Sequence, residues 1–242
     1  MDFRKDYIGK SILIVGGGTS TLDRNWDKLD YDFLWTCNDF YKNDKVLSKK
    51  IDLYQLGYET DITSKVLMDK LKADKPFVYY EPEHFRNNKQ KSDEFIAFKE
   101  YIDTPILAMN IDLGEVQYNP AQKSGATFRM ILLAMQATRA RKVNFVGFDG
   151  FNKEFSNAHA FSGRVGLKDT DTRRDWNDSI HSYVNVFVDA YTVLASLEDN
   201  NRLRNLGEGL DYNLGTELSK KYFPLSKDIY ETIRWDSNSS TS

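Results

Sequence analysis

SILIVGGGTS, residues 11–20, joins an apolar run to three consecutive glycines. A short apolar run that ends in glycines is typical of a buried parallel strand, because helices cover both faces of such a strand. The glycines let the backbone turn sharply and approach a ligand closely. A helix beginning near Ser20 would point its N–H groups at an anion, usually a phosphate. The stretch therefore predicts an α/β sheet with a phosphate or nucleotide at its first turn. The alternative is a tight strand-to-helix turn without a ligand.

Further short apolar runs follow along the chain. They cover residues 33–37, 51–55, 77–80, 105–109, 143–148 and, more weakly, 202–206. Between them, apolar residues recur with the spacing of one helix face. Three such sets are Ile62, Val66, Leu67 and Leu71; Phe128, Ile131, Leu132 and Met135; and Tyr183, Val184, Phe187, Tyr191 and Leu194. The alternation predicts an α/β fold: one Rossmann-like domain with a mostly parallel sheet of about seven strands and helices on both faces.

The length of 242 residues favours one domain over two. We expect residues 1–235 to form it and the Ser/Asn/Thr-rich residues 236–242 to be a disordered tail. The polar residues 81–92 are predicted to form a surface loop. Residues 150–177 are about as long as a structureless loop becomes inside a compact domain, which favours a mobile lid.

Composition narrows the classes of function. Lysine and arginine number 33 against 36 acidic residues, so the sequence lacks the basic excess of a duplex-DNA binder, and nucleic acid is not an expected partner. Cys37 is the one cysteine, which excludes an intrachain disulfide and argues against structural zinc. The sequence shows neither a signal-peptide pattern nor the roughly 20 apolar residues of a membrane span. We therefore expect a cytoplasmic protein.

Polar residues follow several predicted strands. Asn38 comes directly after the run 33–37, where open α/β sheets form a ligand crevice, and its amide can both donate and accept hydrogen bonds. Its alternative role is to stabilise the following turn. Ser124 and Gly125 open a predicted helix, either beside the same ligand or as a plain N-cap. Asp149, at the end of the run 143–148, could position substrate or cap the turn into the lid.

His181 is the candidate general base. Asn177 or Asp178 could cap a helix that places His181 in its first turns. A helix N-terminus lowers the pKa of histidine, and a neutral imidazole is what a general base requires. The alternative is an isolated surface histidine.

In this order, the motifs resemble those of the bacterial sialyltransferase family of the Campylobacter type. Its Gly-Asn-Gly-Pro-Ser turn is similar to residues 16–20, and its Cys-Asn-Gln-Phe-Tyr stretch to residues 37–41. The resemblance continues through Lys49-Lys50, Tyr54-Gln55, Lys123-Ser124-Gly125, residues 147–151, His159-Ala160-Phe161 and His181-Ser182. It spans residues 10 to 200, with weak identity between the motifs.

The resemblance implies a glycosyltransferase that uses a CMP-linked sugar donor as substrate, with no cofactor and no metal. His181 would take the proton of the acceptor hydroxyl. The family's two phosphate-binding tyrosines correspond to Phe151 and His159, and His159 could still donate a hydrogen bond to the leaving phosphate. Together with Asp149, the candidate nucleotide-binding residues are Gly16, Gly17, Gly18, Ser20, Asn38, Gln55, Ser124 and Gly125.

The expected activity is a metal-independent, inverting transfer of a sugar, sialic-acid-like or other, to a glycan or other hydroxyl acceptor. A homo-oligomer and peripheral contact with a membrane are compatible with this expectation. Because both tyrosines are replaced, a non-catalytic nucleotide-binding protein of the same fold is the second hypothesis. The third hypothesis is a Rossmann-type NAD-dependent enzyme. Its glycine fingerprint would need a glycine at Thr21, and its one candidate for the ribose-binding acid is Asp39. The Asp-x-Asp pattern of residues 169–171 lies in the predicted lid, and we interpret it as chance.

Overall fold

The computed structural model describes residues 5–57, 60–80, 89–104, 106–108, 126–148 and 202–207. Within these ranges the strands form one sheet in the order β5-β4-β3-β2-β1-β6-β7, and every neighbouring pair is parallel. The strands are β1 (Ser11–Val15), β2 (Phe33–Cys37), β3 (Leu53–Leu56), β4 (Phe77–Tyr80), β5 (Ile106–Ala108), β6 (Lys142–Val146) and β7 (Leu203–Asn205). The predicted parallel α/β sheet is confirmed.

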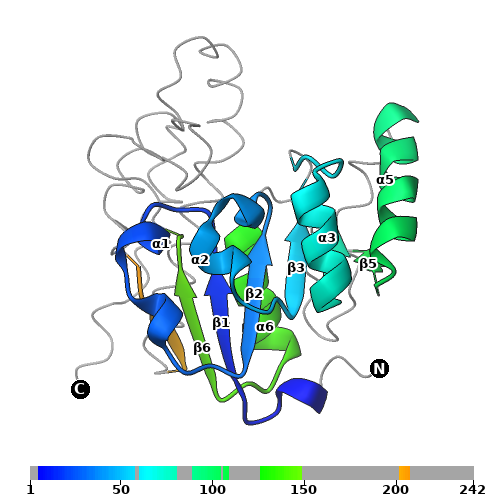
Figure 1. Cartoon of the computed structure of the whole chain (residues 1–242). Helices are drawn as coiled ribbons and strands as arrows, with labels where there is room; N and C mark the ends of the chain where they lie inside the picture. The colour runs from blue at the N-terminus through cyan, green and yellow to red at the C-terminus, as the bar shows by residue number, and fades with distance from the viewer. Residues whose placement is uncertain are drawn as a thin grey trace, which may run out of the picture.

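Helices lie on both faces of this sheet, with α2 and α3 in front of it and α6 behind it in the view of Figure 1. The α-helices are α1 (Ser20–Asp23), α2 (Asp44–Leu47), α3 (Lys65–Asp74), α5 (Lys89–Ile102) and α6 (Ala126–Ala137). Short 3-10 turns are η1 (Lys5–Tyr7), η2 (Trp26–Lys28) and η3 (Phe40–Lys42). The helix α6 packs against β1, β2 and β6, whereas α5 packs against α3.

The main core lies between the sheet and the helices α3 and α5. Leu67 and Leu71 of α3 are fully buried there, one helical turn apart. Val66, which the sequence pattern placed on the same face, is 51% exposed instead. Adjacent positions along a helix are rotated by about 100° from each other, and the core side of α3 includes Leu67 but not Val66.

Several element boundaries differ by a few residues from the sequence predictions. The strand β3 begins at Leu53 rather than at residue 51, and the Ile51 N–H donates to the Asp74 carboxylate. The strand β6 ends at Val146, since Gly147 adopts the left-handed φ of 77°. The helix α5 begins at Lys89, so the end of the predicted surface loop 81–92 is helical; residues 81–88 lie outside the described residues.

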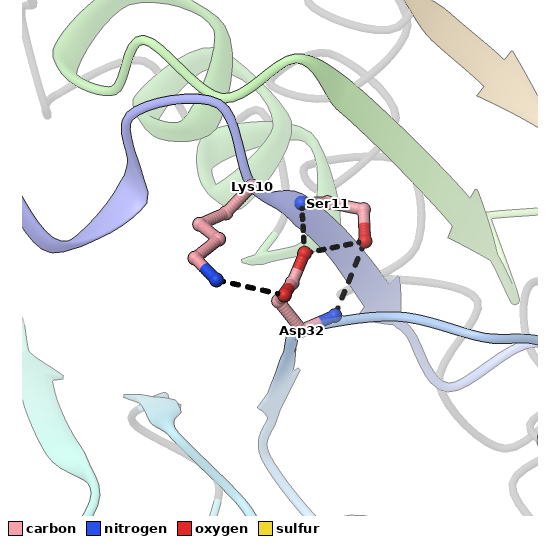
Figure 2. Close-up of polar contacts among 3 residues, drawn as sticks. All are labelled: Lys10, Ser11 and Asp32. Atoms are coloured by element: carbon pink, nitrogen blue, oxygen red, sulfur yellow. Dashed lines mark hydrogen bonds and ion pairs between the residues drawn. The ribbon is translucent and has the colours of Figure 1, made fainter.

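Asp32 fastens the amino end of β1 to the start of β2. Its Oδ2 accepts hydrogen bonds from the Ser11 N–H at 2.8 Å and the Ser11 hydroxyl at 3.0 Å (Figure 2). The Lys10 Nζ lies 3.2 Å from the other oxygen of Asp32. These hydrogen bonds, first of all the one from the Ser11 backbone, lower the pKa of Asp32.

The same arrangement recurs twice along the sheet. Asp52 accepts from the Leu34 N–H of β2 at 2.9 Å, and Asp74 accepts from the Ile51 N–H at 2.8 Å. Burial outweighs the hydrogen bond at Asp52 and raises the pKa of this carboxyl. The amino ends of three successive strands are therefore tied by aspartates. Each aspartate is also ion-paired to a lysine, and these lysines are Lys10, Lys50 and Lys70.

Candidate functional site

The connection between strands reverses direction at β1. The chain runs outward from β1 through β2, β3, β4 and β5, and then returns to place β6 on the other side of β1. Open parallel sheets bind ligands at such a reversal, outside the carboxyl ends of the strands. The glycine turn 16–20 leaves β1 at this point and Gly147 leaves β6 beside it.

Gly16 and Gly147 hold the ends of β1 and β6 in close contact. The Gly16 N–H donates to the Val146 carbonyl, and the Gly18 N–H to the Gly147 carbonyl, both at 2.8 Å. A Cβ on Gly16 would lie 2.5 Å from the Gly147 carbonyl oxygen and 2.4 Å from Thr127 Oγ1. The absence of a side chain at Gly16 is thus required by β6 and α6 of this chain, whether or not a ligand approaches.

Ser20 also binds the protein itself. Its side chain is 1% exposed, and its hydroxyl oxygen accepts a hydrogen bond from the Gly147 N–H at 3.1 Å. The helix that begins here, α1, has four residues, and the Thr21 N–H donates back to the Gly18 carbonyl. The expected helix is therefore only about one turn long, and some of the N–H groups at its start already donate to carbonyls of the preceding turn. Gly17 and Gly18 form the partly exposed side of the turn.

Thr21 occupies the position of the third glycine in a dinucleotide-binding fingerprint. Its side chain holds the glycine turn 16–20 in place. Its hydroxyl donates to the Gly18 carbonyl at 2.7 Å and accepts from the Asn43 amide at 3.1 Å. Its methyl group lies against Gly147, 2.6 Å from where a Cβ would stand. Asn43, which no sequence pattern singled out, connects this turn to α2, because its side-chain oxygen accepts from the Lys45 N–H.

Asn38 follows β2 with the left-handed φ of 48°. Asparagine adopts this conformation more readily than most residues do. Its N–H donates to the Gln55 carbonyl, and its own carbonyl accepts from the Tyr54 hydroxyl, both at 3.0 Å. The side-chain oxygen of Asn38 is buried and has no hydrogen-bond partner among the described residues.

Gln55 lies beside Asn38, near the carboxyl end of β3. It is 1% exposed, and its side-chain oxygen likewise has no partner in the described part of the chain. The structure thus brings Asn38 and Gln55 together, two of the residues that the sequence assigned to the nucleotide. Cys37 is a poor nucleophile, because burial raises the pKa of its thiol to about 12.

Asp39 is the residue on which the NAD hypothesis depends. Its Oδ2 lies 2.8 Å from the Lys42 Nζ, while its Oδ1 is buried without a partner in the described ranges. The carboxylate that would bind a ribose hydroxyl is therefore partly occupied by an ion pair three residues away.

The remaining candidate residues lie outside the described residues and stay predictions. They are Ser124, Gly125, Asp149, Phe151, His159, His181 and the pattern 169–171. Across the ranges that the structure describes, no three His, Cys, Asp or Glu side chains converge as metal ligands do. Nor does any described helix have the length and apolar character needed to cross a membrane.

Solved structures of other proteins share the fold of this chain. The sialyltransferase CstII from Campylobacter jejuni, in complex with cytidine-5′-monophosphate, superposes with a TM-score of 0.50 and 16% identity over 84% of this chain and 85% of that one. The chain has a sialyltransferase-like fold. A second CstII complex, with CMP-3FNeuAc, gives a TM-score of 0.50 and 16% identity over 82% of each chain.

The monofunctional alpha-2,3-sialyltransferase Cst-I from Campylobacter jejuni gives a TM-score of 0.56 and 17% identity. This match covers 95% of the present chain and 84% of Cst-I. No protein-family model and no curated protein matches the sequence. At this level of identity the likeness establishes a common fold, and the function has to be argued from the site.

Proposed function

We propose that the protein binds a CMP-linked sugar at the carboxyl ends of β1, β2 and β3 and transfers the sugar to a hydroxyl acceptor. The observation that carries the proposal is the pair of side-chain oxygens of Asn38 and Gln55, which are buried and have no partner among the described residues. They lie close to the reversal of the sheet, on a fold shared with a sialyltransferase in complex with cytidine-5′-monophosphate.

The free energy of burial supports this assignment. A buried polar atom without a hydrogen bond costs about 1–3 kcal/mol. Two such oxygens on adjacent strand ends are therefore a burden to the folded chain that a ligand offering hydrogen-bond donors would relieve. The amino group of a base or the hydroxyls of a ribose provide such donors, and the amide nitrogens of Asn38 and Gln55 can bind acceptors on the same ligand.

Transfer then proceeds as a direct displacement. The acceptor oxygen attacks the anomeric carbon of the donor sugar as the bond from that carbon to the phosphate oxygen breaks, which inverts the configuration. His181 receives the acceptor proton, and His159 stabilises the negative charge on the departing CMP. Residues 150–177 close over the donor and exclude water, which would otherwise hydrolyse it. The acceptor class is a glycan or another hydroxyl compound.

A thermal-shift panel tests the nucleotide assignment. CMP, UDP, GDP, NAD and ATP are each added with and without EDTA. A ligand that binds the folded state alone raises the unfolding midpoint by mass action. CMP is expected to raise it selectively and to the same extent with EDTA present. A response to NAD alone, or to UDP only with a divalent metal, would refute the CMP assignment.

Turnover distinguishes the second candidate, a nucleotide-binding protein without transferase activity. The replacement of the family's two tyrosines by Phe151 and His159 favours it, because Phe151 has no hydroxyl to offer the phosphate. Release of CMP from CMP-sialic acid, measured with and without acceptor glycans, separates the two. The transferase is expected to release CMP, and His181→Ala to abolish the release while it keeps CMP binding. Binding without any release supports the second candidate.

A further inference from the structure

The backbone of Asn38 is held from the neighbouring strand. Tyr54 lies on β3, is fully buried and packs its ring against Phe40 with centroids 5.2 Å apart. Its hydroxyl donates to the Asn38 carbonyl at 3.0 Å. A buried ring leaves this hydroxyl little freedom, so the hydrogen bond fixes the peptide that follows Asn38. Together with the bond from the Asn38 N–H to Gln55, it supports the left-handed conformation of Asn38.

The side chain of Asn38 rests on Gly57, just after β3. A Cβ on Gly57 would stand 2.3 Å from Asn38 Oδ1, 3.1 Å from Cγ and 3.5 Å from Nδ2. The Asn38 amide therefore occupies the space that any other residue at position 57 would fill. Gly57 does not have the positive φ that favours glycine, so its backbone would accept alanine.

This contact differs in kind from the one at Gly16. The nearest groups to a Cβ on Gly16 include the backbone of Gly147, which cannot move without separating β1 from β6. At Gly57 all three near atoms belong to the end of one side chain. A methyl group there would turn the Asn38 amide away and leave the strands in place.

We propose that Gly57 and Tyr54 are positioning residues of the nucleotide site, which set the direction of the Asn38 amide and thereby the affinity for the nucleotide. This inference rests on the proposed function, because it takes Asn38 as a nucleotide contact. Gly57 controls the side chain and Tyr54 the backbone of the same residue. Neither has to touch the ligand to act on its binding.

A double-mutant cycle between Gly57→Ala and Asn38→Ala tests the proposal, with CMP binding measured by calorimetry. Gly57→Ala is expected to weaken CMP binding about tenfold, comparable to the loss of one or two hydrogen bonds. In the Asn38→Ala background the same change is expected to have no further effect, because the displaced amide is already absent. Independent, additive effects of the two substitutions would overturn the proposal.

The role of the Tyr54 hydroxyl is tested by Tyr54→Phe, with Tyr101→Phe as the matched control. Tyr54→Phe is expected to weaken CMP binding about fivefold, the equivalent of one ordinary hydrogen bond. Tyr101→Phe also removes a single hydroxyl. This hydroxyl donates to Asp69 at 2.5 Å, between the helices α5 and α3. The Tyr101→Phe variant is expected to bind CMP as the wild type does. Equal losses in both variants would show a general effect of stability and contradict the role of Tyr54.

A readout without nucleotide separates this inference from the proposed function. The side-chain amide resonance of Asn38 is assigned by its disappearance in Asn38→Ala. It is expected to shift in Gly57→Ala and in Tyr54→Phe, and to stay in place in Tyr101→Phe. An unmoved resonance in Gly57→Ala overturns the positioning role by itself. A shifted resonance in a protein that binds no nucleotide overturns the proposed function, and with it the effect on affinity.

Discussion

Replacing Gly16 by alanine tests the close contact between β1 and β6. The new Cβ would stand 2.5 Å from the Gly147 carbonyl oxygen, 3.0 Å from the Gly147 carbonyl carbon and 2.4 Å from Thr127 Oγ1. Because two of these three atoms are backbone, the clash can be relieved only by moving one strand end from the other. Overpacking of a well-packed interior costs about 1–3 kcal/mol, and we expect the upper end of that range here.

The assay is thermal denaturation of Gly16→Ala and Gly57→Ala beside the wild type. For a domain of this size, a loss of about 3 kcal/mol lowers the unfolding midpoint by roughly 6–12 °C. Gly57→Ala introduces an equally close contact but against the movable Asn38 side chain, so its free energy of unfolding is expected to change by less than about 1 kcal/mol. Equal losses in the two variants, or none in Gly16→Ala, would refute the argument from backbone contact.

Four further changes test the contacts that hold the strands and helices in place. Asp32→Asn is expected to lower stability at neutral pH: the folded-state pKa is lowered, so the carboxylate stabilises the fold above its ordinary pKa and this contribution disappears as pH falls through the folded pKa. Asp52→Asn is expected to keep or raise stability at neutral pH, because burial raises the pKa of Asp52 and its ionisation therefore opposes folding as pH rises. Denaturation across about pH 3–7 compares how the free energy of unfolding of each variant depends on pH. Lys75→Gly is expected to raise the free energy of unfolding by about 0.5–1 kcal/mol, because Lys75 ends α3 with the left-handed φ of 52°; an unchanged denaturation midpoint would contradict this. Arg202→Met is expected to lower it by about 2–3 kcal/mol, since this guanidinium donates to the Ala140, Met135 and Thr138 carbonyls at the end of α6, and Arg202→Lys is expected to recover part of the loss in the same assay.

Much of the sheet could be predicted because buried parallel strands leave continuous apolar runs. The runs 11–15, 33–37 and 77–80 match β1, β2 and β4 residue for residue. The whole of the helix α5 was missed, because its first turn, from Lys89, is polar and resembles a loop. Its core residues Phe95, Phe98 and Ile102 have helical spacing and could have revealed it.

The sequence indicates the strand ends proposed for the site, but not the contacts that hold them together. A glycine-rich turn after the first strand and a polar residue after the second indicate a crevice at those strand ends. That Gly16 is required by Gly147, and that Tyr54 fixes Asn38, depends on contacts between residues far apart in sequence. No local pattern encodes such contacts. The hydrogen bonds from aspartates to the amino ends of the strands could not be predicted for the same reason.

Calorimetric titration of CMP into the wild type and Asn38→Ala is the most direct test of the proposed nucleotide site. The wild type is expected to bind one CMP per chain in the presence of EDTA. Asn38→Ala is expected to bind it at least tenfold more weakly. A wild type that does not bind CMP, or an Asn38→Ala variant that binds it equally well, would contradict the assignment of this crevice to the nucleotide.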